Sequence, residues 1–242
     1  NTAVGGFALR VNTTGAYNVA VGDYALDANT TANYNNAVGV NSLTDNITGT
    51  QNNAFGYTAL KSNTTANNNT AFGMQAMYAN TTGASNTALG AYALDANTTA
   101  ASNVAVGMHA LGLNTTGASN VAVGAYALDA NTTATNNSAV GYGALGAITT
   151  GSDNVAVGYN AGDAATQAHS SVFIGKDAGG AFTTGNATVA VGMSALATGT
   201  TASATTTVGF EAGKAITTGT HNTVLGCQAG LAATTCTYNT LI

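Results

Sequence analysis

An apolar residue followed by Gly recurs along the whole chain at a constant spacing of 17 residues. The Gly of each copy lies at Gly5, Gly22, Gly39, Gly56, Gly73, Gly90, Gly107, Gly124, Gly141, Gly158, Gly175, Gly192, Gly209 and Gly226. Surface loops tolerate insertions readily, so a register kept over fourteen copies indicates that each copy stacks on the next. We therefore predict a solenoid in which each 17-residue repeat forms one turn.

The residue before the Gly forms a column that we call the apolar column. Its members are Val4, Val21, Val38, Phe55, Phe72, Leu89, Val106, Val123, Val140, Val157, Ile174, Val191, Val208 and Leu225. We expect this column to form the core of the solenoid. The preceding residue, usually Ala as at Ala105, should then point away from the core, because successive strand side chains alternate between faces. An Ala-Leu pair three and four residues after the Gly, as in Ala93-Leu94, predicts a second apolar strip.

The other half of each repeat is polar and equally regular. A pair of Thr residues lies eight and nine residues after the Gly, as in Thr13-Thr14, and an Asn column precedes it from Asn12 to Asn131. A second Asn column lies four residues before the Gly. Stacked Asn amides can hydrogen-bond from one turn to the next, so we expect two Asn ladders at corners. The same Asn-Thr-Thr tripeptides match the N-glycosylation signal, but the ladder explains their period better.

No repeat contains apolar residues at helical spacing, so the elements are strands and turns. Each repeat has room for two short strands and two turns, or for three very short strands. At about 4.8 Å per turn, fourteen turns predict a rod on the order of 65–70 Å long. Its narrow interior accepts few side chains, and the Ala column and the Ala-Leu strip add more apolar surface than this interior can bury. We therefore expect copies of the chain to associate laterally.

Composition and charge exclude several classes of partner. Only 5% of the 242 residues are charged, the net charge is −5, and the chain has no Pro and no Trp. A negative chain lacks the counterion-release drive toward nucleic acid and the attraction to anionic lipid. We expect no nucleic-acid partner and no membrane insertion, since no apolar stretch approaches the roughly 20 residues of a membrane helix. Any targeting or anchoring segment should lie outside this chain.

Residues that could carry catalysis or bind a metal are scattered over different columns. His109, His169 and His221 occupy three columns and lack the spacing of metal ligands, so we interpret them as solvated surface residues. Acidic residues share one column at Asp27, Asp95, Asp129 and Asp163, but never in adjacent repeats. This spacing avoids like-charge repulsion and does not suit a catalytic pair or a calcium ladder. We predict no enzyme activity, no cofactor and no metal.

Two further groups of residues have more than one interpretation. Tyr24, Tyr92, His109 and Tyr126 share one column and could stack on sugars of a receptor; packing at a seam between copies explains them equally well. Cys227 and Cys236 lie nine residues apart within one repeat and could form a disulfide in an extracellular chain. We favour two small buried thiols over the disulfide.

The repeat motif resembles that of two families of extracellular fibres. Segments such as NVAVGDYALDANTT are similar to the head repeats of YadA-like trimeric autotransporter adhesins, and closer still to the NTAVG-AL-NTTG repeats of bacteriophage tail-fibre proteins. The resemblance covers the whole chain and implies a left-handed parallel β-roll that is trimeric and extracellular. The Asn column before the Thr pair departs from the pattern after Asn131. This departure puts in doubt whether the last third has the same cross-section.

These observations predict an all-β protein, a parallel β-solenoid of fourteen 17-residue turns, left-handed and trimeric by resemblance. Residues 1–242 should form a single repeat domain and a fragment of a longer fibre. Its function would be structural and adhesive, as the shaft or head of a phage tail fibre on the virion, with itself and a host cell-surface glycan or protein as partners. The alternatives are a trimeric bacterial surface adhesin or extracellular filament subunit, and an ice-binding solenoid. Against ice binding, adjacent Thr residues should point to opposite faces.

Overall fold

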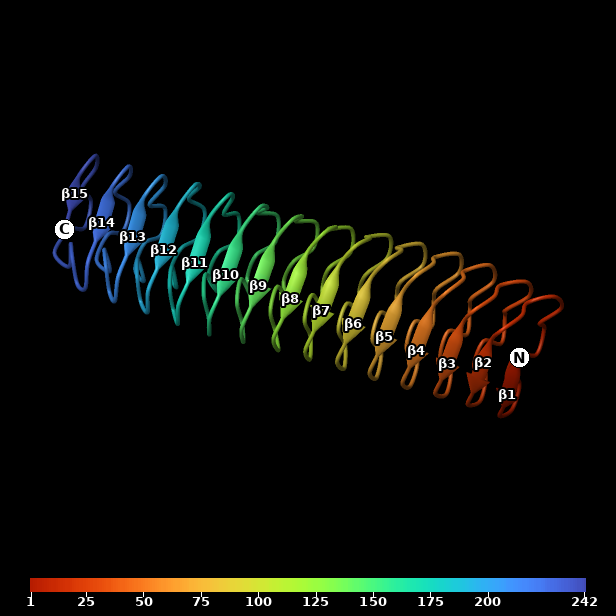
Figure 1. Ribbon diagram of the computed structural model, residues 1–242. Helices are drawn as coiled ribbons and strands as arrows, with labels where there is room; N and C mark the ends of the chain where they lie inside the picture. The colour runs from red at the N-terminus through yellow and green to blue at the C-terminus, as the bar shows by residue number, and fades with distance from the viewer. The chain divides into compact units, whose positions relative to one another are not determined.

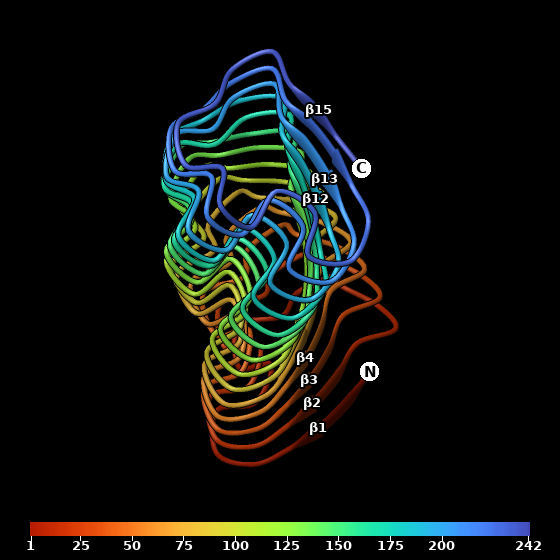
Figure 2. The same ribbon diagram turned by 90° about the vertical axis from the view of Figure 1, so that its left-hand side faces the viewer.

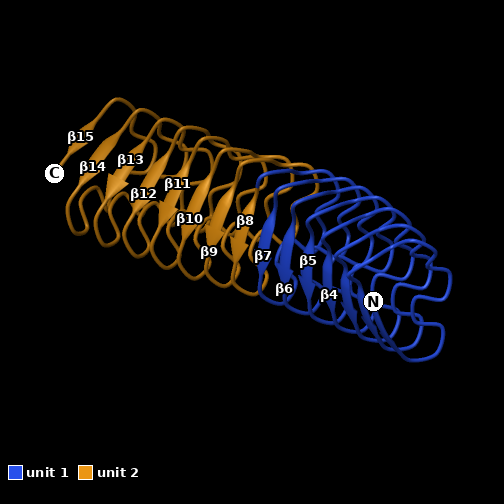
Figure 3. Ribbon diagram, turned by 45° about the vertical axis from the view of Figure 1, so that its right-hand side comes forward, with its two compact units in different colours: residues 1–119 blue, residues 120–242 orange.

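The computed structural model describes all residues, 1–242, and the chain is an all-β parallel solenoid with one strand per 17-residue turn. It divides into two compact units, residues 1–119 and 120–242 (Figure 3). Unit 1 contains β1 (Thr2–Val4), β2 (Val19–Val21), β3 (Asn36–Val38), β4 (Asn53–Phe55), β5 (Thr70–Phe72), β6 (Thr87–Leu89) and β7 (Val104–Val106). Unit 2 contains β8 (Val121–Val123), β9 (Ser138–Val140), β10 (Val155–Val157), β11 (Val172–Ile174), β12 (Val189–Val191), β13 (Thr206–Val208), β14 (Thr223–Leu225) and β15 (Thr240–Leu241).

Within each unit every strand pairs in parallel with the strand of the next turn, at an offset of 17 residues (Figure 1). The predicted solenoid and its repeat are therefore confirmed. The expectation of two or three strands per turn is wrong, because the Thr pair lies in a bend and the rest of each turn is non-strand backbone. Left-handed winding stays a prediction.

The interior of each turn is lined by the Ala column and by the Leu of the Ala-Leu pair. Ala20 and Ala105, at the centres of β2 and β7, are fully buried, and so are Leu26 and Leu111. In Figure 2 the strands form one wall of each turn and the chain folds back opposite them, so the strand centre faces inward. The core of the fold is thus a narrow space filled from one wall by methyl groups and from the other by Leu side chains.

The prediction that the apolar column forms the core is wrong. Eight of its members are 38–58% exposed, namely Val4, Phe72, Leu89, Val140, Val157, Ile174, Val208 and Leu225. The others are half-buried, namely Val21, Val38, Phe55, Val106, Val123 and Val191. The side chains of the Ala column and of the apolar column point to opposite faces of the strand, as expected. However, the Ala column points inward and the apolar column points outward. The Leu residues and the Asn amides already occupy the interior, so most turns leave room for only a methyl group at the strand centre.

Left-handed backbone bends the chain between strands. The second and fourth residues after each Gly have positive φ, as at Tyr24 (59°) and Leu26 (51°). This conformation costs a non-Gly residue about 1 kcal/mol, whereas full burial of a Leu side chain contributes about 2 kcal/mol. The Gly of the motif has a different reason: at Gly90, with φ at 142°, a Cβ would lie 2.5 Å from the carbonyl oxygen of Gly107.

Two Asn ladders brace the interior, as predicted. In the first ladder, Asn69 donates its side-chain amide to the carbonyl oxygen of Gly83 (2.9 Å), and its side-chain oxygen accepts from the backbone N–H of Asn86 (2.9 Å). In the second, Asn80 donates to the side-chain oxygen of Asn63 (3.0 Å) and to the same Gly83 carbonyl (3.0 Å). Each ladder therefore ties a turn both to itself and to its neighbour.

The glycosylation interpretation of the Asn-Thr-Thr tripeptides does not fit the folded chain. The Asn residues from Asn29 to Asn131 in this column are fully buried. Their side-chain amides donate the hydrogen bonds of the ladder, as at Asn46 and Asn63. A glycan needs an exposed amide, so the ladder accounts for these residues.

In the last third of the chain each turn keeps its strand, but different side chains fill its interior. Hydroxyl groups stand in the first ladder at Ser171, Thr188 and Thr205, where Thr188 donates to the carbonyl oxygen of Ala202 (2.7 Å), and Asn returns at Asn222. Buried apolar side chains such as Ile148 and Phe182 replace the second ladder. The departure of the Asn column from its pattern thus corresponds to a different interior within the same turn length.

We expect Asn69→Ala to lower the free energy of unfolding by about 2–4 kcal/mol, because it removes two buried hydrogen bonds and leaves the Asn86 N–H unpaired. Asn69→Thr is the matched control. A hydroxyl serves the same ladder at Thr188, so this variant should recover a substantial part of the loss. Urea unfolding followed by far-UV circular dichroism measures both variants, and equal stability of Asn69→Ala and wild type would contradict the bracing role.

Candidate interaction surface

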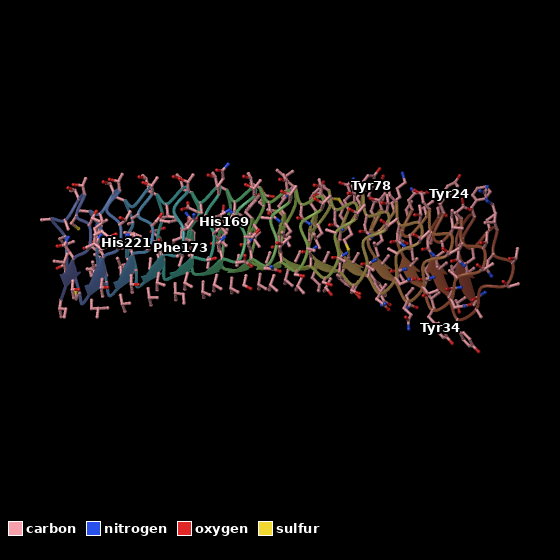
Figure 4. All side chains as sticks on the ribbon, turned by 90° about the horizontal axis from the view of Figure 1, so that it is seen from above. Tyr24, Tyr34, Tyr78, His169, Phe173 and His221 are labelled. Atoms are coloured by element: carbon pink, nitrogen blue, oxygen red, sulfur yellow. The ribbon has the colours of Figure 1, made fainter.

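The first and third residues of every strand form an outward face that we call the outer strand face. It consists of the apolar column and of the column two residues earlier, which contains Val, Thr, Asn and Ser. In Figure 4 the side chains of this face project away from the strands along one side of each unit. None of the four Lys and Arg residues and none of the nine Asp and Glu residues lies in a strand. The outer strand face is therefore free of charge, with the apolar column beside a column of mixed Val, Thr, Asn and Ser.

Aromatic and amide side chains on this face contact each other from turn to turn. The rings of Phe55 and Phe72 stack with centroids 5.6 Å apart. Asn36 donates its side-chain amide to the side-chain oxygen of Asn53 at 2.7 Å. Phe72 is 57% exposed, so a large aromatic side chain of β5 lies open to solvent on this face of unit 1.

A second exposed apolar column follows the Gly, where the chain turns away from the strand. It is interrupted by Asp23, Lys176 and small residues, and we call it the corner column. Its exposed large members are Val40, Tyr57, Met74, Met108, Tyr142, Tyr159, Met193 and Phe210. The turns with a large residue in the corner column thus present two neighbouring apolar strips on their surface.

The predicted receptor-contact residues are only partly brought together. Tyr92 and His109 stack with ring centroids 5.0 Å apart and planes within 6°. Tyr24 stacks on Phe7 instead, at 4.9 Å. Tyr126 lies in unit 2, where its ring meets the edge of Tyr142 at 5.7 Å. Stacking covers part of the ring faces that a sugar would use, so these side chains also stabilise the turns of their own chain.

A second aromatic column was missed in the sequence. Tyr17 and Tyr34 stack at 5.0 Å, and they are 69% and 55% exposed. His221 and Tyr238 stack in the same column at 4.7 Å. Tyr34 lies on the strand side of unit 1 and Tyr24 on the opposite side (Figure 4). The signal was available, because these residues all stand four residues before an apolar residue of the repeat, at Val21, Val38, Leu225 and Ile242.

The Thr pair does not form a two-wide array. The first Thr of each pair is mostly half-buried and donates its hydroxyl to the carbonyl of the next turn, as Thr81 does to Thr98 (3.0 Å). The second, such as Thr82, is exposed. The expectation that the pair points to opposite faces of a strand is wrong, since no strand exists there. A single exposed file of Thr still gives no two-wide surface for ice.

The two Cys residues are free thiols, the interpretation that was favoured over a disulfide. Burial was also expected, but Cys227 is exposed and Cys236 is half-buried. Cys227 belongs to the corner column, which faces outward, and this position explains its exposure.

The three His residues lie apart, in agreement with their different columns. His169 is exposed, and its Nδ1 accepts from the backbone N–H of Ser152 at 3.1 Å. No group of three or more His, Cys, Asp or Glu side chains could hold a metal ion, and no pocket is present. The chain contains no helix with the length and apolar character needed to cross a membrane.

Burial and hydrogen bonding shift the pKa values of two carboxyl groups in opposite directions. Partial burial raises the pKa of Asp163, and the nearby Asp177 carboxylate adds to the shift. A hydrogen bond from Lys214, followed by one from Gln228, lowers the pKa of Glu211.

The raised pKa of Asp163 predicts a small gain in stability from Asp163→Asn near pH 7. The folded state binds a proton more readily than the unfolded state, so this carboxyl group destabilises the fold at neutral pH, and the effect vanishes as pH falls below both pKa values. The variant should melt less than about 3 °C above wild type at pH 7 and at the same temperature as wild type near pH 3. A melting temperature that is lower at pH 7 would contradict this cause.

Comparison with protein-family models, with curated protein sequences and with solved structures finds no match to this chain.

Proposed function

We propose that this chain is a structural and adhesive segment of an extracellular fibre, as in the shaft or head of a bacteriophage tail fibre, built from three parallel copies. The observation that carries the proposal is the uninterrupted 17-residue register, in which strands and buried Asn ladders tie successive turns of each unit together. Such a stack transmits load along its length and sets a defined reach. The resemblance of the repeat to tail-fibre repeats supports the same function.

The two exposed apolar strips support the three-fold arrangement. A closed ring of three copies uses two different surfaces of each copy, one against each neighbour. The outer strand face and the corner column provide two such surfaces, and the second is interrupted where Asp23, Lys176 or a small residue follows the Gly. Attachment to a host glycan or protein would involve the aromatic side chains Tyr24, Tyr92, His109 and Tyr126, of which Tyr24 is 40% exposed.

The alternative function is that of a trimeric bacterial surface adhesin or an extracellular filament subunit. Its support is the repeat motif itself, which both families share. A filament subunit would assemble into open-ended polymers rather than into a closed particle.

The mass of the particle in solution tests the proposal. Light scattering should give a particle of three 23.5 kDa chains with a β circular-dichroism spectrum. A single 23.5 kDa chain at all concentrations would contradict the fibre of three copies, and an open-ended polymer would favour the filament subunit.

A further inference from the structure

We infer that the outer strand face is the surface through which copies of this chain pack against one another. The inference rests on the proposed fibre function and names the seam that this function requires. The Ala column and the Ala-Leu strip, from which lateral association was expected, are both buried within the turn. The apolar surface that remains uncovered belongs to the strands themselves.

The first support is the chemistry of the face. Val140 and Val157 are about 40% exposed, and Phe72 and Leu89 are more exposed still. Every charged side chain of the chain lies outside the strands. Exposed sheet surfaces of soluble proteins normally carry polar or charged side chains outward. A strand face that lacks any charge is therefore typical of a surface that is covered in the assembled protein.

The second support is its size. Neighbouring strands are about 4.8 Å apart and three residues span about 10 Å, so each strand contributes on the order of 50 Å². The seven strands of unit 1 contribute on the order of 350 Å² and the eight strands of unit 2 on the order of 400 Å². A stable protein interface buries about 800 Å² per partner. The strand faces of the two units, each taken by itself, thus add up to nearly this size, and the corner column adds to it.

The third support identifies the occupant as a second copy. The face repeats every 17 residues as ridges of Val, Ile, Leu and Phe about 4.8 Å apart. The corner column of a second copy repeats at the same period, so its side chains can lie between the ridges of the outer strand face. Phe55 and Phe72 would act as anchors, because large aromatic side chains dominate interface energies.

Three forms of the chain test the seam. The first is wild type, the second is Phe72→Asp/Val157→Asp, and the third is Thr82→Asp/Thr150→Asp. The third form adds the same charge at two exposed positions outside the strands and is the matched control. Light scattering over a dilution series gives the mass of each form, and far-UV circular dichroism checks its fold.

We expect wild type and the Thr control to remain associated, and the Phe72/Val157 variant to fall to a folded chain of 23.5 kDa. If the Asp variant does not fold, Phe72→Thr/Val157→Thr replaces it, because Thr occupies the outer strand face at Thr70 and Thr87. This variant should raise the dissociation constant by at least about tenfold.

The outcomes separate the seam from the fibre. A Phe72/Val157 variant that keeps the wild-type mass would overturn the seam and leave the three-copy fibre in place. A wild-type chain that is monomeric at every concentration would overturn both. If such a monomer arrested ice growth in a thermal-hysteresis assay, the same face would be an ice-binding surface instead.

Discussion

Ala105→Asp should prevent folding or lower the free energy of unfolding by more than about 4 kcal/mol, whereas Val106→Asp should cost about 1 kcal/mol or less in the single chain. The two residues are neighbours in β7. The Ala105 side chain is fully buried, and the Val106 side chain points to the opposite face, where it is only half-buried. An Asp at position 105 would bury a carboxylate without a partner, while at position 106 water solvates it.

Thermal unfolding followed by circular dichroism measures both variants at one protein concentration. Val106→Asp should keep the β spectrum of wild type and lose self-association, since it lies on the outer strand face. If Val106→Asp unfolded the chain and Ala105→Asp did not, the apolar column would be the core after all.

Phe173→Ala should lower the free energy of unfolding by about 3–5 kcal/mol, because it leaves a cavity in the interior of unit 2. Phe173 is fully buried and is the one aromatic residue in the Ala column. It lies inside the turn beside the strands (Figure 4) and packs against Phe182, with ring centroids 5.2 Å apart. A Cβ added at Gly162 would lie 2.7 Å from its ring, and one added at Gly179 would also collide with it.

The same geometry predicts a rescue. Gly162 and Gly179 stand where other turns carry Leu, and their φ values of 60° and 63° are close to those of Leu145 and Leu196. The triple variant Phe173→Ala/Gly162→Leu/Gly179→Leu rebuilds the usual interior and should recover stability to within about 2 kcal/mol of wild type. Gly179→Leu alone is the control and should be strongly destabilising. A triple variant no more stable than Phe173→Ala would show that these positions do not share one space.

The period was sufficient to predict the turn, the strand register and the Asn ladders. These features depend on spacing, and each of them repeats at 17 residues. The direction of the strand side chains could not be inferred from hydrophobicity. Val is more apolar than Ala, and the usual rule places it inside. Here side-chain volume determines which strand residue faces inward, because Leu111 and the Asn amides already fill the interior opposite Ala105.

The sizes of the residues in the Ala column and in the second apolar strip are a further signal in the sequence, because a larger residue in one column accompanies a smaller one in the other. At three of the four turns where Gly replaces Leu in the second strip, the Ala column carries a larger residue, as with Gly179 and Phe173, or Gly213 and Thr207. At the fourth turn, Gly162 lies against Phe173 of the next turn. This exchange indicates that both columns point into one space. The residue pattern alone would therefore have been enough to place the Ala column inside the turn.

The candidate seam was predicted only in outline. Excess apolar surface indicated lateral association, but the columns chosen for it are buried. The aromatic column of Tyr92 and His109 was found from its spacing, whereas the column of Tyr17 and Tyr34 was overlooked. Stacking between turns depends on the left-handed backbone at these positions, and residue type alone does not predict that conformation.

Thiol labelling at two neighbouring positions tests whether the Ala column is buried and the apolar column exposed. Ala139→Cys and Val140→Cys are compared in a chain that also carries Cys227→Ser and Cys236→Ser, since both native thiols are free. We expect Cys at 139 to react only when the chain unfolds, because Ala139 is fully buried. Cys at 140 should react at once in a dissociated chain and slowly in the associated particle. Rapid reaction at 139 with protection at 140 in the dissociated chain would show instead that the apolar column is buried and the Ala column is exposed.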